Sequence, residues 1–351
     1  MRKIIFNCET ITPLFLGEAI KGLVELRPPA IKASMRFWWR SMHAHLSLAD
    51  LKKKEAEIFG GGGEHANCST FDIIVENVRG NIEPYNYTDR NSDNNTKIEG
   101  VDKNGTQIGL QYFMYTFFHL KNHGSFYSCG TLFDVTFYFD NDTHINEILA
   151  SFWLLTFLGN LGERSRRGMG GFRIIQIIDN ENTKGGFEFI DNNPATIKQR
   201  IEEIETLFKR GQVSTTTYLN SYSILNKEEI YYASKDSITT WEEALNEIGL
   251  KLKNSRLDEY NHTKISSEKS AAFGLPVRHR NNFTVTPKDF TRRASPLIIK
   301  VLKLNNNTFR WLLVKFDGEF LPATKNLLST GNQADISALA DFINILNKVK
   351  I

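Results

Sequence analysis

An eleven-residue segment rich in glycine and arginine, residues 161–171 (LGERSRRGMGG), constrains the fold of this chain more than any other stretch. It contains four glycines and three arginines, and we call it the Gly/Arg loop. Glycine permits a positive φ and a close approach of the backbone to another molecule, and the guanidinium fork of arginine suits phosphate. The loop follows an apolar helical pattern over 144–161 and precedes a strand-like run from Phe172, so it joins a helix to a strand.

This order excludes the common nucleotide-binding folds. Their glycine-rich loops run from a strand into a helix, because the helix N-terminus meets the phosphate. The loop also lacks Gly-Lys-Ser/Thr, and the spacing of Gly168, Gly170 and Gly171 does not match G-x-G-x-x-G.

The first half of the chain predicts elements in the order β-α-β-β-α-β, which is that of the ferredoxin-like fold shared by RNA-recognition domains. Residues 79–109 are rich in Asn, Asp, Thr and Gly, which favours a long exposed insertion. Periodicity predicts strands at 3–11, 71–78, 130–140 and from 172, helices at 30–48 and 144–161, and a strand-like aromatic run at 112–118.

The second half restarts the pattern after a polar run at 179–186, which places a domain boundary between residues 1–184 and 185–351. Helices are expected at 194–209, 241–256 and 335–349, and a hairpin at 298–303 and 309–316. The predicted fold class is therefore α+β, with two ferredoxin-like domains in tandem and a long polar insertion in the first.

Composition excludes several functional classes. The net charge is only +3, so any affinity for nucleic acid must come from local clusters of Lys and Arg. The three cysteines form no CxxC pair, which argues against a zinc site and suits a reducing cytosol. No apolar run reaches the length of a membrane span, and a strand-like pattern starts directly after Met1, so we expect a cytoplasmic protein without a signal peptide.

The helix predicted at 30–48 carries a cationic row beside tryptophan. Lys32, Arg36 and Arg40 follow one another at intervals of four, with Trp39 on the adjoining face, and no Asp or Glu lies between Glu25 and Asp50. Such a row can be an ordinary solvated face. A cationic surface bordered by an aromatic residue can equally follow a single-stranded nucleic-acid backbone.

The Gly/Arg loop also has two interpretations. It can be a tight connection whose arginines face water. It can also be an anion-binding loop in which Gly168 and Gly170 hold Arg164, Arg166 and Arg167 against a nucleic-acid backbone, and we favour this interpretation because only Glu163 offsets the three charges.

Evidence for catalysis is weak in the sequence. His43 and His45 point in different directions on a helix, and His119 and His123 lie in a stretch that disfavours a helix, so we predict no metal or other cofactor. No nucleophile has an activating sequence context. A metal-independent endoribonuclease that processes guide RNA, with His43 as general base, stays the alternative.

Four stretches resemble a known family: Thr12–Gly17, Glu25–Arg40, Arg164–Gly168, and Phe273–Pro276 with Arg292–Leu297. A glycine-rich loop after the second helix of a ferredoxin-like domain is similar to that of the RAMP superfamily of CRISPR proteins. The run Arg27-Pro28-Pro29 with Arg36-Phe37-Trp38-Trp39-Arg40 resembles, more specifically, subunit one of type III-B (Cmr) RNA-targeting complexes.

The resemblance implies a non-catalytic RNA-binding structural subunit in antiviral defence. It would cap the crRNA 3′-end side of the effector, beside the other RAMP subunits, and engage target RNA. The residues expected to contact RNA are Lys32, Arg36, Trp39, Arg40, Arg164, Arg166, Arg167, Gly168, Gly170, Arg292 and Arg293.

Overall fold

The computed structural model describes residues 2–17, 24–43, 45–63, 66–86, 108–114, 117, 123–179, 181, 189–191, 193–208, 223–235, 238–256, 265–278, 284–288, 291–321 and 328–351. Most of the predicted polar insertion, residues 87–107, lies outside these ranges.

The first sheet has four antiparallel strands in the order β3-β6-β1-β7. Alternate residues of β1 (Ile4, Phe6 and Cys8) are buried, because one face of this sheet packs on helices. In chain order the elements are β1 (Arg2–Thr10), α1 (Pro28–Met42), β3 (Phe71–Arg79), β6 (Leu132–Phe139), α5 (Ile145–Leu158) and β7 (Phe172–Ile178). This is the β-α-β-β-α-β order that the sequence predicted.

The second sheet repeats the same order of elements, and its strands lie in the matching order β11-β12-β8-β13. The strands β11 and β12 form the predicted hairpin, from Leu297↔Lys315 to Lys303↔Phe309. In chain order the elements are β8 (Ile224–Ala233), α7 (Trp241–Asn254), β11 (Leu297–Lys303), β12 (Phe309–Asp317), α9 (Ser337–Asn344) and β13 (Lys348–Lys350).

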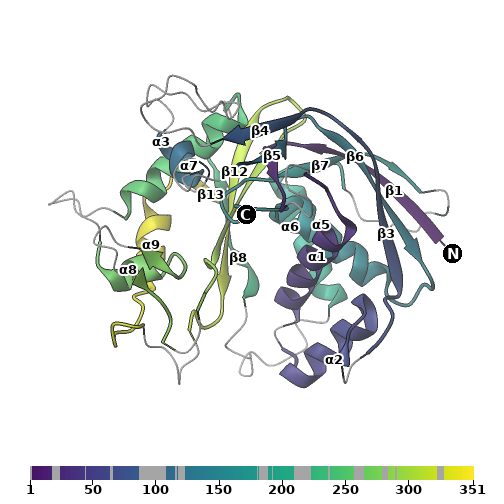
Figure 1. Ribbon diagram of the computed structural model, residues 1–351, viewed down its shortest axis with the longest axis horizontal. Coiled ribbons are helices and arrows are strands. Elements are labelled where there is room, and N and C mark those ends of the chain that lie inside the picture. Colours follow the sequence, from purple (N-terminus) through teal and green to yellow (C-terminus); the bar gives the residue numbers. More distant parts are fainter. Residues whose placement is uncertain are drawn as a thin grey trace.

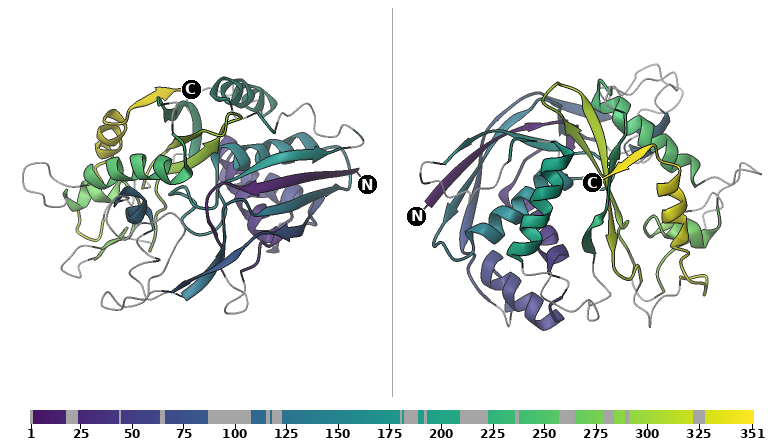
Figure 2. Two further views of the ribbon diagram at one scale, coloured as in Figure 1. Left: turned by 90° about the horizontal axis from the view of Figure 1, so that it is seen from above. Right: turned by 180° about the vertical axis from the view of Figure 1, so that it is seen from behind.

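The two sheets share one layer of helices (Figures 1 and 2). Ile298, Leu312 and Val314 on one face of the second sheet belong to the same core cluster as the buried residues of α1, α5 and α6 (Pro194–Leu207). Ile299 and Leu313 on the other face pack with α7 and α9. The layers are therefore sheet, helices, sheet and helices, with the second sheet covered on both faces.

The helix α6 follows the predicted domain boundary at residue 184, yet its Ile197, Ile201 and Ile204 lie in the core shared with the first sheet. It contacts both α5 and β8. The segment after the boundary therefore fastens the two halves together.

Part of the predicted insertion is a strand. Residues of β4 (Ile82–Asn86) pair with β5 (His123–Tyr127), which also pairs with β2 (Leu14–Phe15). Residues 79–82 are exposed, as expected for this insertion, and backbone pairing of β4 with β5 supplies an order here that apolar periodicity did not indicate.

Three other elements differ from the predictions. A strand was expected at 112–118, but residues 112 and 113 belong to the helix α3 (Ile108–Phe113). Leu110 and Phe113 of this helix are buried in the core with residues of α7. The helix expected at 30–48 ends at Met42, and Ser47 caps a separate helix, α2 (Leu48–Phe59). The helix expected at 335–349 ends at Asn344, and its last residues form β13.

The remaining short elements are α8 (Ser267–Ala271), β9 (Val277–Arg278) and β10 (Thr284–Val285). The strands β9 and β10 pair with each other, and a small core cluster including Leu275, Val277 and Leu328 lies beside them.

Candidate nucleic-acid interface

The Gly/Arg loop is closed on itself and held by the segment that leads into and forms β2. Leu161 N donates to Gly170 O at 3.0 Å, and Gly170 N donates to Pro13 O at 2.8 Å. The Thr12 hydroxyl donates to Gly168 O at 2.8 Å. The sequence showed both segments but did not reveal that they contact each other.

Packing explains the glycines of this loop. Gly168 and Gly170 have φ of 85° and 73°, a region that other residues rarely adopt. A Cβ at Gly170 would lie 1.9 Å from Leu161 O, and one at Gly168 would lie 2.4 Å from a methyl carbon of Leu245. Both glycines are buried, so their main effect is to set the path of the loop.

Arg166 extends from the loop toward the second sheet. Its Nη1 donates to Ser295 O at 2.6 Å, and its guanidinium lies 4.9 Å from the ring centre of Phe37 on α1. Burial, followed by the charges of Arg167 and Arg293, lowers the pKa of Arg166 to about 10, which leaves it cationic at neutral pH. It forms no ion pair with any carboxylate of the described residues.

Arg167 binds a second segment of the second half. Its Nη2 donates to Phe273 O at 3.3 Å, whereas its Nη1 is buried without a hydrogen-bond partner. Burial lowers the pKa of Arg167 to about 10, and the neighbouring Arg256 and Arg164 contribute to this lowering. The two adjacent arginines therefore bind carbonyls of two segments of the second half that pair with each other through Leu275 and Arg293.

The other predicted arginines differ in exposure. Arg164 has a positive φ of 56°, and burial lowers its pKa. Arg292 is exposed, whereas Arg293 is half-buried and donates to Glu319 O at 3.0 Å. Of these three, Arg292 is the one whose side chain lies open to solvent.

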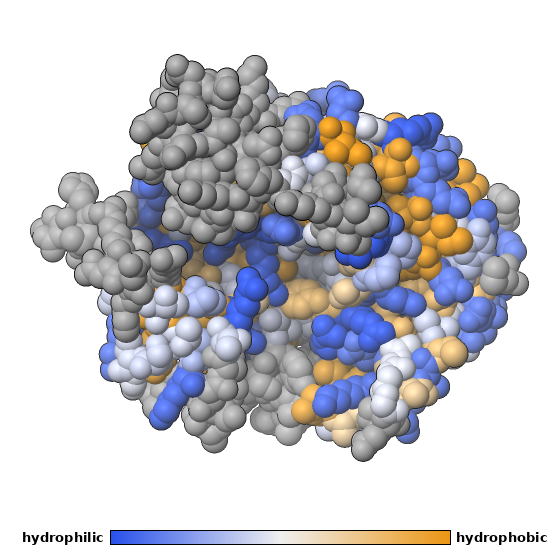
Figure 3. Space-filling view, viewed as in Figure 1, coloured by the Kyte–Doolittle hydropathy of each residue, from blue (hydrophilic) through white to orange (hydrophobic). Residues whose placement is uncertain are grey.

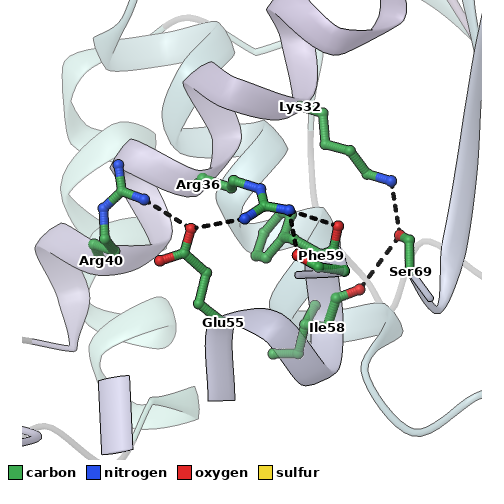
Figure 4. Close-up of polar contacts among 8 residues, drawn as sticks. Lys32, Arg36, Arg40, Glu55, Ile58, Phe59 and Ser69 are labelled. Atoms are coloured by element: carbon green, nitrogen blue, oxygen red, sulfur yellow. Dashed lines mark hydrogen bonds and ion pairs between the residues drawn. The ribbon is translucent and has the colours of Figure 1, made fainter. Parts of the chain in front are cut away.

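The cationic row on α1 has an acidic partner, which corrects the sequence interpretation (Figure 4). Glu55 on α2 accepts from Arg36 at 3.1 Å and from Arg40 at 2.7 Å. Arg36 also donates to the carbonyls of Phe59 and Gly60 at the end of α2. The expectation of an uncompensated row was wrong, because the partner lies beyond residues 26–49, the stretch in which no acid occurs.

Lys32, the first residue of the row, also binds protein atoms. Its Nζ donates to the Ser69 hydroxyl at 2.7 Å and lies 4.6 Å from the ring centre of Phe71. Burial lowers the pKa of Lys32. The row therefore joins α1 to α2 and to the start of β3.

We expect replacement of Glu55 by alanine to lower the free energy of unfolding by about 2–3 kcal/mol, because two guanidinium groups lose a buried carboxylate. Urea denaturation measures this change. The matched control is Glu57→Ala, an exposed glutamate of the same helix, which should change stability by less than about 0.5 kcal/mol. Equal effects of the two changes would contradict a structural role of Glu55.

Trp39 does not border a groove, which is a second correction. It is fully buried, its Nε1 donates to Glu147 at 3.0 Å, and it stacks on His43 with ring centres 3.9 Å apart. The helical pattern placed Trp39 on the apolar face, and the packing of α1 on α5 covers that face completely.

His43 is buried with Trp39. Its Nδ1 lies 2.8 Å from Trp39 O, and burial lowers the pKa of His43 to about 4. A buried imidazole with so low a pKa is a weak base, which makes His43 a poor candidate for the general base of the alternative hypothesis. Within the described residues no group of three or more metal-ligating side chains occurs, and His119 lies outside them.

A cavity of about 120 Å³ lies where α1, the Gly/Arg loop and β11 meet. The sequence did not reveal this junction, because its parts are far apart in the chain. Figure 3 shows that the face seen in Figure 1 is hollowed between the two halves, with hydrophilic residues on both sides. The lining residues of the cavity are Ser34, Phe37, Trp38, Gly159, Asn160, Ser165, Arg166 and Ile298.

Sequence reasoning also missed Lys300 and Asn160. Lys300 on β11 is fully buried and donates to Phe172 O at 3.0 Å, and burial lowers its pKa to about 7. Asn160 donates to Ser165 O and to Ile299 O. Both polar side chains join the loop region to the second sheet. The local sequence pattern does not indicate these contacts, since Lys300 is a single polar residue in the apolar strand β11.

Comparisons with known proteins identify the family. The family model of the RAMP superfamily matches residues 7–173. The Pyrococcus furiosus protein named CRISPR system Cmr subunit Cmr1-1 is 26% identical over 334 residues, which cover 92% of this chain and 89% of that protein. Subunit Cmr1-2 of the same organism is 25% identical over 191 residues, which cover 50% of this chain and 96% of that protein.

Solved structures share the fold. The crystal structure of Cmr1 from P. furiosus in its apo form has a TM-score of 0.65 at 21% identity, covering 99% of this chain and 98% of that one. A chain of the type III-B Cmr-beta complex bound to cognate target RNA, solved by cryo-electron microscopy, has a TM-score of 0.55 at 15% identity, with coverage of 99% and 98%. No helix within the described ranges is long and apolar enough to cross a membrane. The RAMP family model and the similarity to the two Cmr1 proteins support assignment of this chain as a RAMP subunit of a type III-B (Cmr) CRISPR complex.

Proposed function

We propose that this chain is a non-catalytic RNA-binding structural subunit of a type III-B effector complex, built from two ferredoxin-like domains in tandem. It caps the crRNA 3′-end side beside other RAMP subunits, in the cytoplasm, and engages target RNA. The similarity to Cmr1-1 over 92% of the chain carries this proposal. The similarly folded chain of the Cmr-beta complex belongs to an assembly bound to cognate target RNA, which supports RNA as the ligand.

The charge around Arg166 supports an RNA contact at the junction of the two halves. Two further cations, Arg167 and Arg293, lie close to Arg166. One N–H of the Arg166 guanidinium donates to Ser295 O, and the other N–H groups can donate to RNA. The exposed Arg292 is in the same segment as Arg293. The Lys32, Arg36 and Arg40 row contributes less, because its members already bind protein atoms.

Salt dependence of RNA binding tests this assignment. Each phosphate contact that is lost should reduce the slope of log K against log salt by about 0.7 for single-stranded RNA. We expect Arg292→Ala and Arg293→Ala each to reduce the slope, and Lys350→Ala, an exposed lysine of β13 paired with Glu228, to leave it unchanged. Unchanged slopes in both arginine variants, with normal RNA affinity, would favour a pure protein cap instead.

A cleavage assay with the same RNA, labelled, tests the absence of catalysis. The labelled RNA should be recovered intact after long incubation with the purified chain in the presence of a metal chelator. Cleavage that is lost in His43→Ala would establish the endoribonuclease alternative.

A further inference from the structure

The cavity between α1, the Gly/Arg loop and β11 combines apolar walls with one charged side chain. Phe37 and Trp38 come from α1, Ile298 comes from β11, and Arg166 alone is charged among the described residues that line it. The guanidinium carbon of Arg166 lies 4.9 Å from the ring centre of Phe37 and 5.9 Å from that of Phe316, so two aromatic rings pack around it. A planar donor beside apolar walls fits a planar ring with an acceptor edge better than a bare phosphate.

The polar groups around the cavity set a donor and acceptor pattern. Arg166 has only donors to offer, and one of them is committed to Ser295 O. The Ser34 hydroxyl donates to Ala30 O at 3.0 Å, which leaves its oxygen as an acceptor. The amide N–H groups of Asn160 bind Ser165 O and Ile299 O, so Asn160 forms a fixed wall. A matching ring therefore carries an acceptor beside an N–H donor.

The size of the cavity restricts the ring. A protein cavity of about 150 Å³ holds one benzene molecule, so about 120 Å³ leaves no room for a fused purine and takes a single six-membered ring by its edge. Uracil and cytosine each present an acceptor next to an N–H group on one edge. We propose that this cavity binds a single unstacked pyrimidine base of the RNA, held by the guanidinium of Arg166 and the hydroxyl of Ser34 between the walls formed by Phe37 and Ile298. The proposal rests on the RNA-binding function proposed above.

The test compares short oligouridine, oligocytidine and oligoadenosine of equal length with the full chain. Ser34→Leu fills the cavity without removing a cation, and we expect it to weaken oligopyrimidine binding by roughly tenfold while oligoadenosine binding is unchanged. The salt slope should stay the same, because no phosphate contact is lost. Ala33→Leu is the matched control, since Ala33 is exposed on the same turn and does not line the cavity.

A second variant separates the base contact from a folding defect. Arg166→Lys keeps the charge but loses the planar fork, so it should lose the pyrimidine preference and retain the salt slope. The proposal is overturned if the unchanged chain binds the three oligonucleotides equally, or if Ser34→Leu weakens all three alike while its thermal unfolding matches that of Ala33→Leu. Failure of the unchanged chain to bind any RNA overturns the proposed function instead.

Discussion

Replacement of Gly170 by alanine is expected to lower the free energy of unfolding by about 4 kcal/mol or to prevent folding altogether. The residue has a φ of 73°, and the new Cβ would lie 1.9 Å from Leu161 O. The backbone would have to move, which would break the bonds that Gly170 makes to Leu161 and Pro13. Urea denaturation of the purified variant measures the loss.

Gly130→Ala is the control that separates backbone strain from the clash. Gly130 has a similar φ of 79°, but nothing lies within 4 Å of the place where its Cβ would be. This control should lose only about 1–2 kcal/mol, the cost of a left-handed conformation for an L-residue. If both variants lost the same amount, the tight closure of the Gly/Arg loop would contribute nothing to stability.

Replacement of Lys300 by methionine is expected to stabilise the protein at pH 6, by about 2–5 kcal/mol. The ammonium is fully buried, and burial lowers its pKa from 10.5 to about 7. Because the pKa in the folded state is below that in the unfolded state, the unfolded chain binds more protons between about pH 7 and 10.5. The stability of the unchanged protein therefore rises with pH across this window, and the cost of the buried charge is fully present below it.

The advantage of Lys300→Met should accordingly be largest at pH 6 and shrink as the pH approaches 10. Urea denaturation at several pH values measures both proteins side by side. Lys315→Met is the control, because Lys315 on β12 is half-exposed and pairs with Glu229. An effect of Lys300→Met on stability that did not vary with pH would show that a change in packing or hydrogen bonding, and not the buried charge, decides the outcome.

Element order was the part of the fold that the sequence predicted best. The apolar runs of 145–158 and 132–139 can be recognised in a short window, because α5 is buried between the two sheets and β6 is a central strand. Predictions failed where partners from far along the chain decide the outcome. The residues from 108 form a helix because α7 covers them, and residues 348–350 form a strand because β8 offers a free edge.

The candidate site was harder to predict for the same reason. A stretch without acids around Arg36 and Arg40 indicated a bare cationic row, but Glu55 from the next helix pairs with both arginines and offsets part of their charge. The arginines of the Gly/Arg loop were found by composition, whereas their bonds to Ser295 and Phe273 depend on how the second half packs on the first. The RNA contacts themselves stay predictions.

Because the two halves of this chain share one layer of helices, we do not expect them to fold as independent domains. Each sheet relies on α1, α5 and α6 for one of its apolar faces, so neither half retains a complete interior when it is separated from the other. A fragment ending at residue 184 would lose α6 and uncover the helices that the second sheet protects. Recombination between related proteins should therefore exchange this subunit whole, even though its topology resembles a duplication.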